Sequence, residues 1–253
     1  MKLHYKSYGS GEPLIILHGL LGSLDNWRSV SLELAQYFRI LAPDQRNHGH
    51  SPHSDVMNYV VMAKDISELM DLENLRTAFL LGHSMGGKTA MQLALRHPER
   101  VAKLIVVDMA PRPYSPRHAK IVSAMLALGL AKFQARRQVQ EALAPAIPDL
   151  AVRQFLLKNL ESDSAGALRW RIGLRQISLN YDSLRQSIDS PLPFDHPTLF
   201  IRGERSDFLT ESDLPSIQNH FPQARLETVP QAGHWVHADN PTVFIQKVRE
   251  FLH

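Results

Sequence analysis

The sequence contains no cysteine and no long apolar run. The first absence excludes disulfides, thiolate nucleophiles and thiolate metal sites. The second excludes a membrane-spanning helix, which needs about 18 or more consecutive apolar residues. The N-terminal stretch also lacks the apolar core of a secretory signal. We therefore expect a cytoplasmic protein without a membrane span.

An excess of charge is also missing, because the net charge of the 253 residues is only +3. Residues 112–196 nevertheless hold 12 Lys and Arg against 7 Asp and Glu, and the remainder holds 16 against 18. These basic residues are spread among Leu and Ala and do not form a concentrated basic stripe with interleaved aromatics, which argues against a nucleic-acid partner. The basic residues of this segment belong either to solvated helix faces or to a positively charged lid that attracts anionic substrates.

Apolar runs alternate with helical patterns along most of the chain. This alternation predicts an α/β fold with a mostly parallel central sheet flanked by helices. The expected strands cover residues 2–8, 14–18, 39–42, 77–81, 103–108, 198–202 and 225–229. The expected helices cover residues 26–37, 60–72, 88–97 and 241–252.

Nearly 90 residues, bounded by proline clusters, separate the fifth and sixth expected strands. A loop of this length would be unusual in a compact domain, and its Leu, Ala, Gln and Arg content is helical. We expect residues 1–111 and 197–253 to form a base domain and residues 112–196 to form a helical cap. Such a cap would cover the carboxyl ends of the strands, where ligands bind in these sheets.

The sequence Gly82-His83-Ser84-Met85-Gly86 lies where an apolar strand gives way to a helical pattern. A strand, a G-x-S-x-G turn and a helix form the nucleophile elbow of α/β-hydrolases. Glycines suit a turn this tight because they lack a Cβ. Ser84 is therefore the candidate nucleophile, and the alternative is a glycine-rich turn without chemistry.

A serine nucleophile needs a base and an acid that orients it. His234 follows the last strand in a loop, late in the chain, which matches the Ser, Asp, His order of this fold. Asp108 and Asp207 both follow apolar strands, so the pattern leaves the choice of acid open. The aspartate that is not the acid would be a capping or loop residue.

Acyl transfer also needs backbone N–H groups aimed at the developing oxyanion. We expect these donors at Met85, which starts the helix after the nucleophile, and at Leu20, which follows the strand over residues 14–18. Candidate substrate-binding side chains stand beside the catalytic loops and at the cap entrance: Tyr114, Arg117, Phe208 and Trp235, with Arg112 as a further candidate contact for phosphate.

Three histidines, His48, His50 and His53, lie close together in sequence. An intervening glycine and proline, with no patterned carboxylates nearby, argue against a designed metal site. The chemistry outlined above requires neither a metal nor an organic cofactor. The polar loop that contains Asp44, Arg46 and His48 is expected to brace the rim of the active site.

Motifs across the whole chain resemble the α/β-hydrolase superfamily, and more narrowly the small bacterial esterases of the YbfF type. The residues that carry the resemblance are His18-Gly19, Gly22-Ser23-Leu24-Asp25-Asn26, Asp44-x-Arg46-Asn47-His48-Gly49-x-Ser51, Gly82 to Lys88, Val107 to Pro111, Phe155 to Lys158 and Gly233 to Ala238. The resemblance implies hydrolysis of carboxylic esters and acyl-CoA thioesters, and it assigns the acid to Asp108.

The sequence thus predicts a serine hydrolase that acts on a small-molecule ester or acyl-CoA through an acyl-enzyme. A perhydrolase or a carbon–carbon bond hydrolase would use the same three residues. A ligand receptor that kept the fold without the chemistry is the alternative from another class. No sequence feature specifies the acyl chain length or the oligomeric state.

Overall fold

Seven strands form the central sheet of the computed structural model, which describes residues 1–253. Their order across the sheet is β1-β3-β2-β4-β5-β8-β9, and every neighbouring pair is parallel except β1 with β3. Their bounds are β1 (Tyr5–Tyr8), β2 (Pro13–Leu17), β3 (Arg39–Pro43), β4 (Ala78–His83), β5 (Val101–Val107), β8 (Thr198–Gly203) and β9 (Ala224–Val229). The predicted α/β class with a mostly parallel sheet is confirmed.

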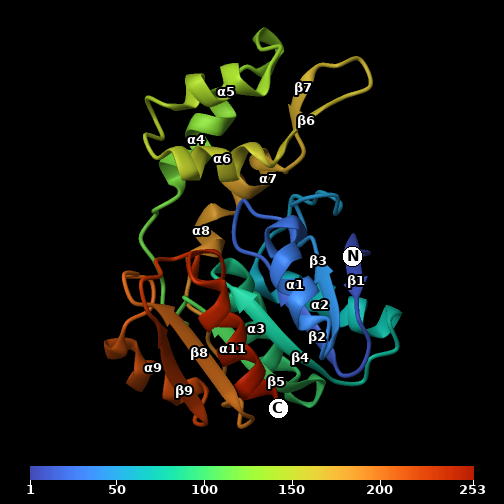
Figure 1. Ribbon diagram of the computed structural model, residues 1–253, viewed down its shortest axis with the longest axis vertical. Coiled ribbons are helices and arrows are strands. Elements are labelled where there is room, and N and C mark those ends of the chain that lie inside the picture. The colour runs from blue at the N-terminus through green and yellow to red at the C-terminus, as the bar shows by residue number, and fades with distance from the viewer.

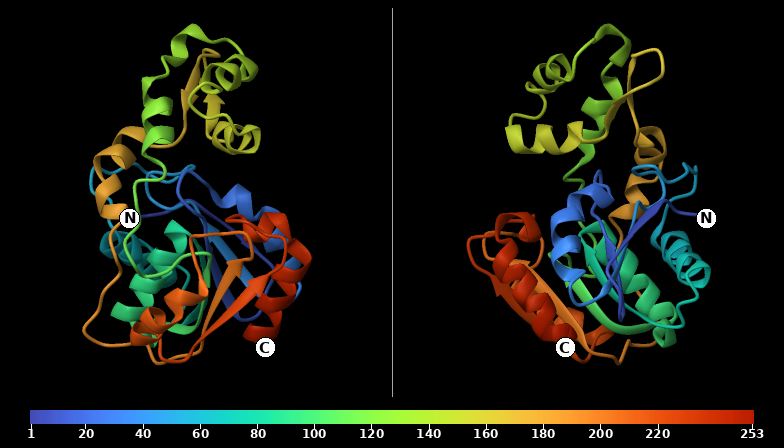
Figure 2. Two further views of the ribbon diagram at one scale, coloured as in Figure 1. Left: turned by 90° about the vertical axis from the view of Figure 1, so that its left-hand side faces the viewer. Right: turned by 45° about the vertical axis from the view of Figure 1, so that its right-hand side comes forward.

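Helices cover both faces of the sheet because successive strand residues point to opposite sides (Figures 1 and 2). Leu80 of β4 belongs to a core with α2 (Tyr59–Leu72), α3 (Met85–Arg96) and α9 (Leu214–His220), and its neighbour Leu81 to a core with α1 (Arg28–Leu34) and α11 (Pro241–Leu252). Both faces are covered, so the central strands read as continuous apolar runs. The short elements of this part are η1 (Leu24–Trp27), η2 (Pro98–Arg100), η4 (Glu211–Asp213) and α10 (Val236–Asp239).

Some predicted boundaries were wrong by a few residues. Helix α3 begins at Met85 and not at residue 88. The predicted start was too late because Gly86 and Gly87 are weak helix formers, although both lie in the first turn of the helix. The predicted helix over residues 26–37 is divided into η1 and α1, and α1 already ends at Leu34. The helices α9 and α10 were not predicted.

Most of the chain between β5 and β8 lies beyond the carboxyl ends of the strands and forms the upper part of the molecule in Figure 1, and the residues after its last helix return along the base to the start of β8 (Figure 2). Its elements are α4 (Ala119–Ala127), η3 (Leu130–Lys132), α5 (Arg136–Leu143), α6 (Leu150–Leu157), β6 (Leu160–Ser162), β7 (Leu168–Trp170), α7 (Leu174–Leu179) and α8 (Tyr181–Leu184). The division of the chain into a base and a cap at residues 112 and 196 stays a prediction, and we call residues 112–196 the cap segment below.

The cap segment is not purely helical. Strands β6 and β7 pair as an antiparallel hairpin in which Glu161 lies opposite Arg169, and their side chains form a 2.8 Å ion pair. Three residues per strand are too few to produce a detectable alternation of apolar and polar residues. None of the helices combines the length and apolarity required to cross a bilayer.

Candidate active site

Ser84 occupies the sharp turn between β4 and α3. Its backbone angles, φ 54° and ψ −117°, lie in a region that residues with a side chain rarely adopt. Such strain persists only where the surroundings enforce it. The Ser84 N–H, for example, donates to the carbonyl of Val107 over 3.0 Å. The turn therefore holds Ser84 in a strained backbone conformation at the end of β4, the central strand of the sheet.

The two flanking glycines are required by the closeness of strand and helix. A Cβ at Gly82 would lie 2.2 Å from the carbonyl oxygen of Gly86, and a Cβ at Gly86 would lie 2.4 Å from that of Leu17. Both contacts are with backbone atoms, which cannot move aside as a flexible side chain could. The G-x-S-x-G pattern is thus explained by packing at both glycines.

Asp108 and His234 form a close pair. Asp108 directly follows β5 and is fully buried, and its Oδ2 lies 2.7 Å from His234 Nδ1. The same carboxylate accepts hydrogen bonds from the Ser206 hydroxyl and, at 3.2 Å, from the Gly203 N–H. With Nδ1 bonded to a carboxylate, the imidazole keeps Nε2 as the nitrogen that can accept a proton.

Burial is the main influence on both titrating groups of this pair. It lowers the pKa of His234, and it raises the pKa of Asp108, against which the Ser206 and Gly203 hydrogen bonds act. A lowered pKa keeps the imidazole neutral at neutral pH. The neutral imidazole is the form that can accept a proton from a serine hydroxyl.

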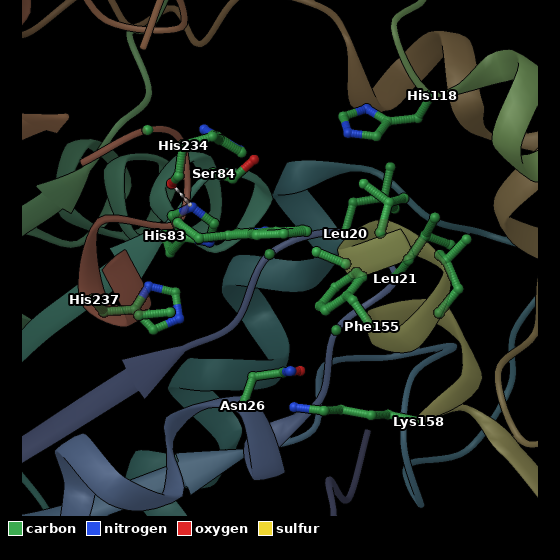
Figure 3. A pocket seen from close by; sticks show the side chains of 18 of the residues that line it. Leu20, Leu21, Asn26, His83, Ser84, His118, Phe155, Lys158, His234 and His237 are labelled. Atoms are coloured by element: carbon green, nitrogen blue, oxygen red, sulfur yellow. Dashed lines mark hydrogen bonds between the residues drawn. The ribbon is translucent and has the colours of Figure 1, made fainter. Parts of the chain in front are cut away.

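The His234 ring is fixed by packing as well as by Asp108. Phe208 stacks on it with ring centroids 3.8 Å apart, and His83 Nε2 lies 2.8 Å from the His234 carbonyl oxygen. Ser84 and His234 line the same cavity (Figure 3). No hydrogen bond joins their side chains, and hydrogen bonds of this kind are often long in unliganded enzymes.

The N–H groups of Leu20 and Met85 make no hydrogen bond within the protein, and both residues border a space beside Ser84. Met85 is the first residue of α3, where the N–H has no partner inside the helix. These two donors are therefore free to bind an oxygen atom of a ligand.

The loop that carries Leu20 is held from both sides at the next residue. His48 Nε2 accepts from the Leu21 N–H over 3.1 Å, and the amide of Asn159 donates to the Leu21 carbonyl over 2.8 Å. Burial lowers the pKa of His48 to about 3, so the ring is neutral and can donate through Nδ1 to the Arg46 carbonyl. The cap segment thus takes part, through Asn159, in positioning this loop.

The cavity at Ser84 has a volume of about 620 Å³, which is in the usual range for small-molecule sites. It lies between the loops at the strand ends and α6 of the cap segment (Figure 3). Of the residues expected to bind substrate, Phe208 and Trp235 line it. Tyr114 and Arg117 do not, and they border a second, smaller space that Ser84 also lines.

The remaining sequence candidates have partners of their own. Asp207 is exposed and forms an ion pair with Arg117, and Arg112 forms one with Asp213 over 2.7 Å. The hydroxyl of Tyr114 donates to the Phe208 carbonyl over 2.6 Å. Of the two aspartates between which the sequence left a choice, the structure brings Asp108 to His234.

Sequence reasoning missed Ser206 and Asn159. Ser206 follows β8 in the same loop as Asp207, so its position at a strand end was a usable signal. Asn159 gave none, because its partner Leu21 is 138 residues away in the chain. No group of three or more His, Cys, Asp or Glu side chains is placed to hold a metal ion.

A model of the alpha/beta hydrolase fold matches residues 12–241. Esterase YbfF of Escherichia coli (strain K12) is 35% identical over 244 residues, which cover 96% of this chain and 94% of YbfF. The sn-1-specific diacylglycerol lipase ABHD11 of Danio rerio is 38% identical over 252 residues, which cover 96% of this chain and 79% of the lipase.

Among solved structures, a marine microorganism esterase matches with a TM-score of 0.97 and 44% identity, covering 99% of both chains. An E-2-(acetamidomethylene)succinate hydrolase, at 23% identity and a TM-score of 0.80, shares the fold over 99% of this chain and 94% of its own. These similarities show that the chain belongs to the α/β-hydrolase family, as a serine hydrolase of the esterase type.

Proposed function

We propose that this protein hydrolyses carboxylic esters through an acyl-enzyme on Ser84, with His234 as general base and acid and Asp108 as its carboxylate partner. The observation that carries the proposal is the 2.7 Å contact of Asp108 with His234, beside a serine under backbone constraint at the mouth of one cavity. Asp207, engaged by Arg117 in solvent, is the weaker candidate for the acid.

The reaction follows from the roles of these groups. His234 Nε2 takes the proton of the Ser84 hydroxyl as its oxygen attacks the ester carbonyl. The N–H groups of Leu20 and Met85 bind the oxyanion, and His234 returns the proton to the departing alcohol. Water then repeats the two steps on the acyl-enzyme and releases the acid.

We extend the proposal to acyl-CoA thioesters, in which a thiol replaces the alcohol and the other steps are unchanged. Lys158 supports this extension, because it is an exposed cation that lines the cavity and forms no ion pair. It could meet a phosphate of the leaving group at the cavity wall. The alcohol or thiol would then be selected by the cap segment.

The decisive test is Ser84→Ala, assayed with p-nitrophenyl acetate and acetyl-CoA. In a comparable triad, loss of the serine costs on the order of a millionfold in kcat, so we expect activity at the background level. The matched control is Ser29→Ala, an exposed serine on α1, which should retain wild-type activity. A fluorophosphonate should label the wild type and the control but not Ser84→Ala, and more than a few per cent of residual activity would refute the proposal.

A further inference from the structure

Ser84 borders a second and much smaller space in addition to the large cavity. Its volume is about 40 Å³, and its walls include Tyr59, Lys88, Met109, Tyr114, Tyr181 and Leu184. The two spaces share Ser84, Leu20, His118 and Phe208. They differ in one residue that matters for chemistry, because His234 lines only the large one. A carbonyl carbon at Ser84 would therefore adjoin two unequal volumes.

The position of His234 indicates which part of an ester belongs in which volume. The leaving group must lie within reach of the imidazole that protonates it, so it belongs in the large cavity. The acyl group is bonded to the same carbon and extends in another direction. The small space is open to it there, beside Ser84 and the two backbone donors of Leu20 and Met85.

We infer that the small space is the acyl site, and that this protein selects esters that join a short, uncharged acyl group to a large alcohol or thiol. This inference rests on the proposed function and narrows its substrate class. A buried water needs roughly 10–15 Å³, so about 40 Å³ holds about two to four non-hydrogen atoms. Beyond the carbonyl group, acetyl, propionyl and butyryl carry one, two and three carbons and fit within this limit, whereas hexanoyl carries five and exceeds it.

Hydrogen bonds within the walls engage the hydroxyl groups of the three tyrosines that border the small space. The Tyr59 hydroxyl donates to the Leu184 carbonyl over 2.6 Å, and the Tyr181 hydroxyl accepts from the His118 N–H over 2.8 Å. Tyr114 is held by Phe208 as described above. The hydroxyl groups of these three tyrosines therefore already have partners within the protein.

The cations around the small space are also engaged, which argues against an acyl group that carries a carboxylate. Arg117 pairs with Asp207, and Arg185 pairs with Asp182 over 2.9 Å. Lys88 donates to the carbonyl of Arg112 over 2.8 Å and to that of Gln186, and its ammonium lies 5.0 Å from the Tyr114 ring centroid. Neither arginine is left to neutralise a second negative charge, and the Lys88 ammonium is held by two backbone carbonyls.

Two ester series test the inference. The first keeps p-nitrophenol and lengthens the acyl group from acetate through butyrate and hexanoate to octanoate. The second keeps acetate and enlarges the alcohol from phenol to 1-naphthol. One methylene changes kcat/KM by about 10-fold or more where a pocket discriminates. We expect a drop of at least tenfold between butyrate and hexanoate, and no drop along the acetate series.

Substitutions of residues that line either the small space or the large cavity show which of the two limits the length of the acyl group. Leu184→Ala should move the drop to longer acyl groups, and Leu184→Phe should move it to shorter ones. Met109→Ala enlarges the same space from another segment, and it replaces Leu184→Ala if that variant does not fold by circular dichroism. The matched control is Phe155→Ala, which enlarges only the large cavity. It should change the acetate series and leave the position of the acyl drop where it was.

The opposite pattern would overturn the inference: an acyl drop that Phe155→Ala moves and the Leu184 variants do not. A wild type that hydrolyses octanoate as well as acetate would also overturn it. Neither result touches the proposed function, which fails only if Ser84→Ala stays active or the wild type escapes fluorophosphonate labelling.

Discussion

Replacing Asp108 by asparagine tests the assignment of the acid with almost no change of shape. In the wild type, Oδ2 of Asp108 accepts from His234 and from the Ser206 hydroxyl, and Oδ1 accepts from the Gly203 N–H. An asparagine can place its NH2 group in only one of these two positions. Each choice has a different consequence for the imidazole.

If the NH2 group occupies the Oδ1 position, it meets the Gly203 N–H, and a buried donor is left without an acceptor at a cost of about 1–3 kcal/mol. If it occupies the Oδ2 position, the Ser206 hydroxyl can turn to accept, and the buried Gly203 N–H keeps its acceptor. His234 must then accept at Nδ1 and carry its proton on Nε2, where it cannot take one from Ser84. The second arrangement is favoured, and it removes the base.

We therefore expect kcat to fall by about 10⁴ in Asp108→Asn, the effect of this substitution in a comparable triad. At 1.36 kcal/mol for each factor of ten, this is about 5 kcal/mol of transition-state stabilisation. Asp207→Asn loses only an exposed ion pair, worth about 0–1 kcal/mol. We expect this variant to keep kcat within about threefold of the wild type.

The assay is hydrolysis of p-nitrophenyl acetate by both variants, with urea unfolding at pH 8 as the control for folding. Burial raises the pKa of Asp108, so the folded protein binds more protons than the unfolded chain just above pH 3.8. The carboxylate therefore opposes folding at pH 8, and Asp108→Asn should be at least as stable as the wild type. A larger loss of kcat in Asp207→Asn than in Asp108→Asn would refute the assignment.

Three further predictions concern the surroundings of the site. Gly86→Ala should lower the free energy of unfolding in urea by at least about 1–3 kcal/mol, because its Cβ would meet the Leu17 carbonyl, whereas Gly129→Ala, with no atom within 4 Å, should not. Asn159→Ala should lower kcat about tenfold with little change in KM, because it releases the Leu20 loop and an oxyanion donor is worth about 10²–10³; an unchanged kcat would contradict this. Burial lowers the pKa of Lys88 from its ordinary 10.5 to about 7, so between these pH values the unfolded chain binds more protons and stability rises with pH. Lys88→Met should lack this rise in urea unfolding at pH 7, 8.5 and 10, and an equal rise in both proteins would count against it.

The sequence predicted the sheet well because its central strands are buried on both faces. Strand β4 and the second half of β5 appear as apolar runs, and the glycines around Ser84 mark the turn between β4 and α3. The β6–β7 hairpin was missed because three-residue strands leave no periodic signal. Its stabilising pair, Glu161 and Arg169, looks in sequence like two ordinary surface charges.

The choice between Asp108 and Asp207 illustrates a limit of sequence reasoning about sites. Each follows an apolar strand, and the two strands are neighbours in the sheet. What separates them is the direction of the side chain: Asp108, with φ 50°, turns into the protein, and Asp207 reaches solvent and Arg117. Residue spacing does not encode that difference, and here only the resemblance to known esterases favoured Asp108.

The backbones of Ser84 and Asp108 continue the pattern of hydrogen bonds between neighbouring strands of the sheet. The Ser84 N–H donates to Val107 on β5, and the Asp108 N–H donates over 2.8 Å to Ile201 on β8. The separation of the proposed nucleophile and acid is thereby tied to the distance between adjacent strands, a constant of all β-structure. The sequence of the cap segment can therefore differ, for example to suit another substrate, without changing the distance between the backbones of Ser84 and Asp108.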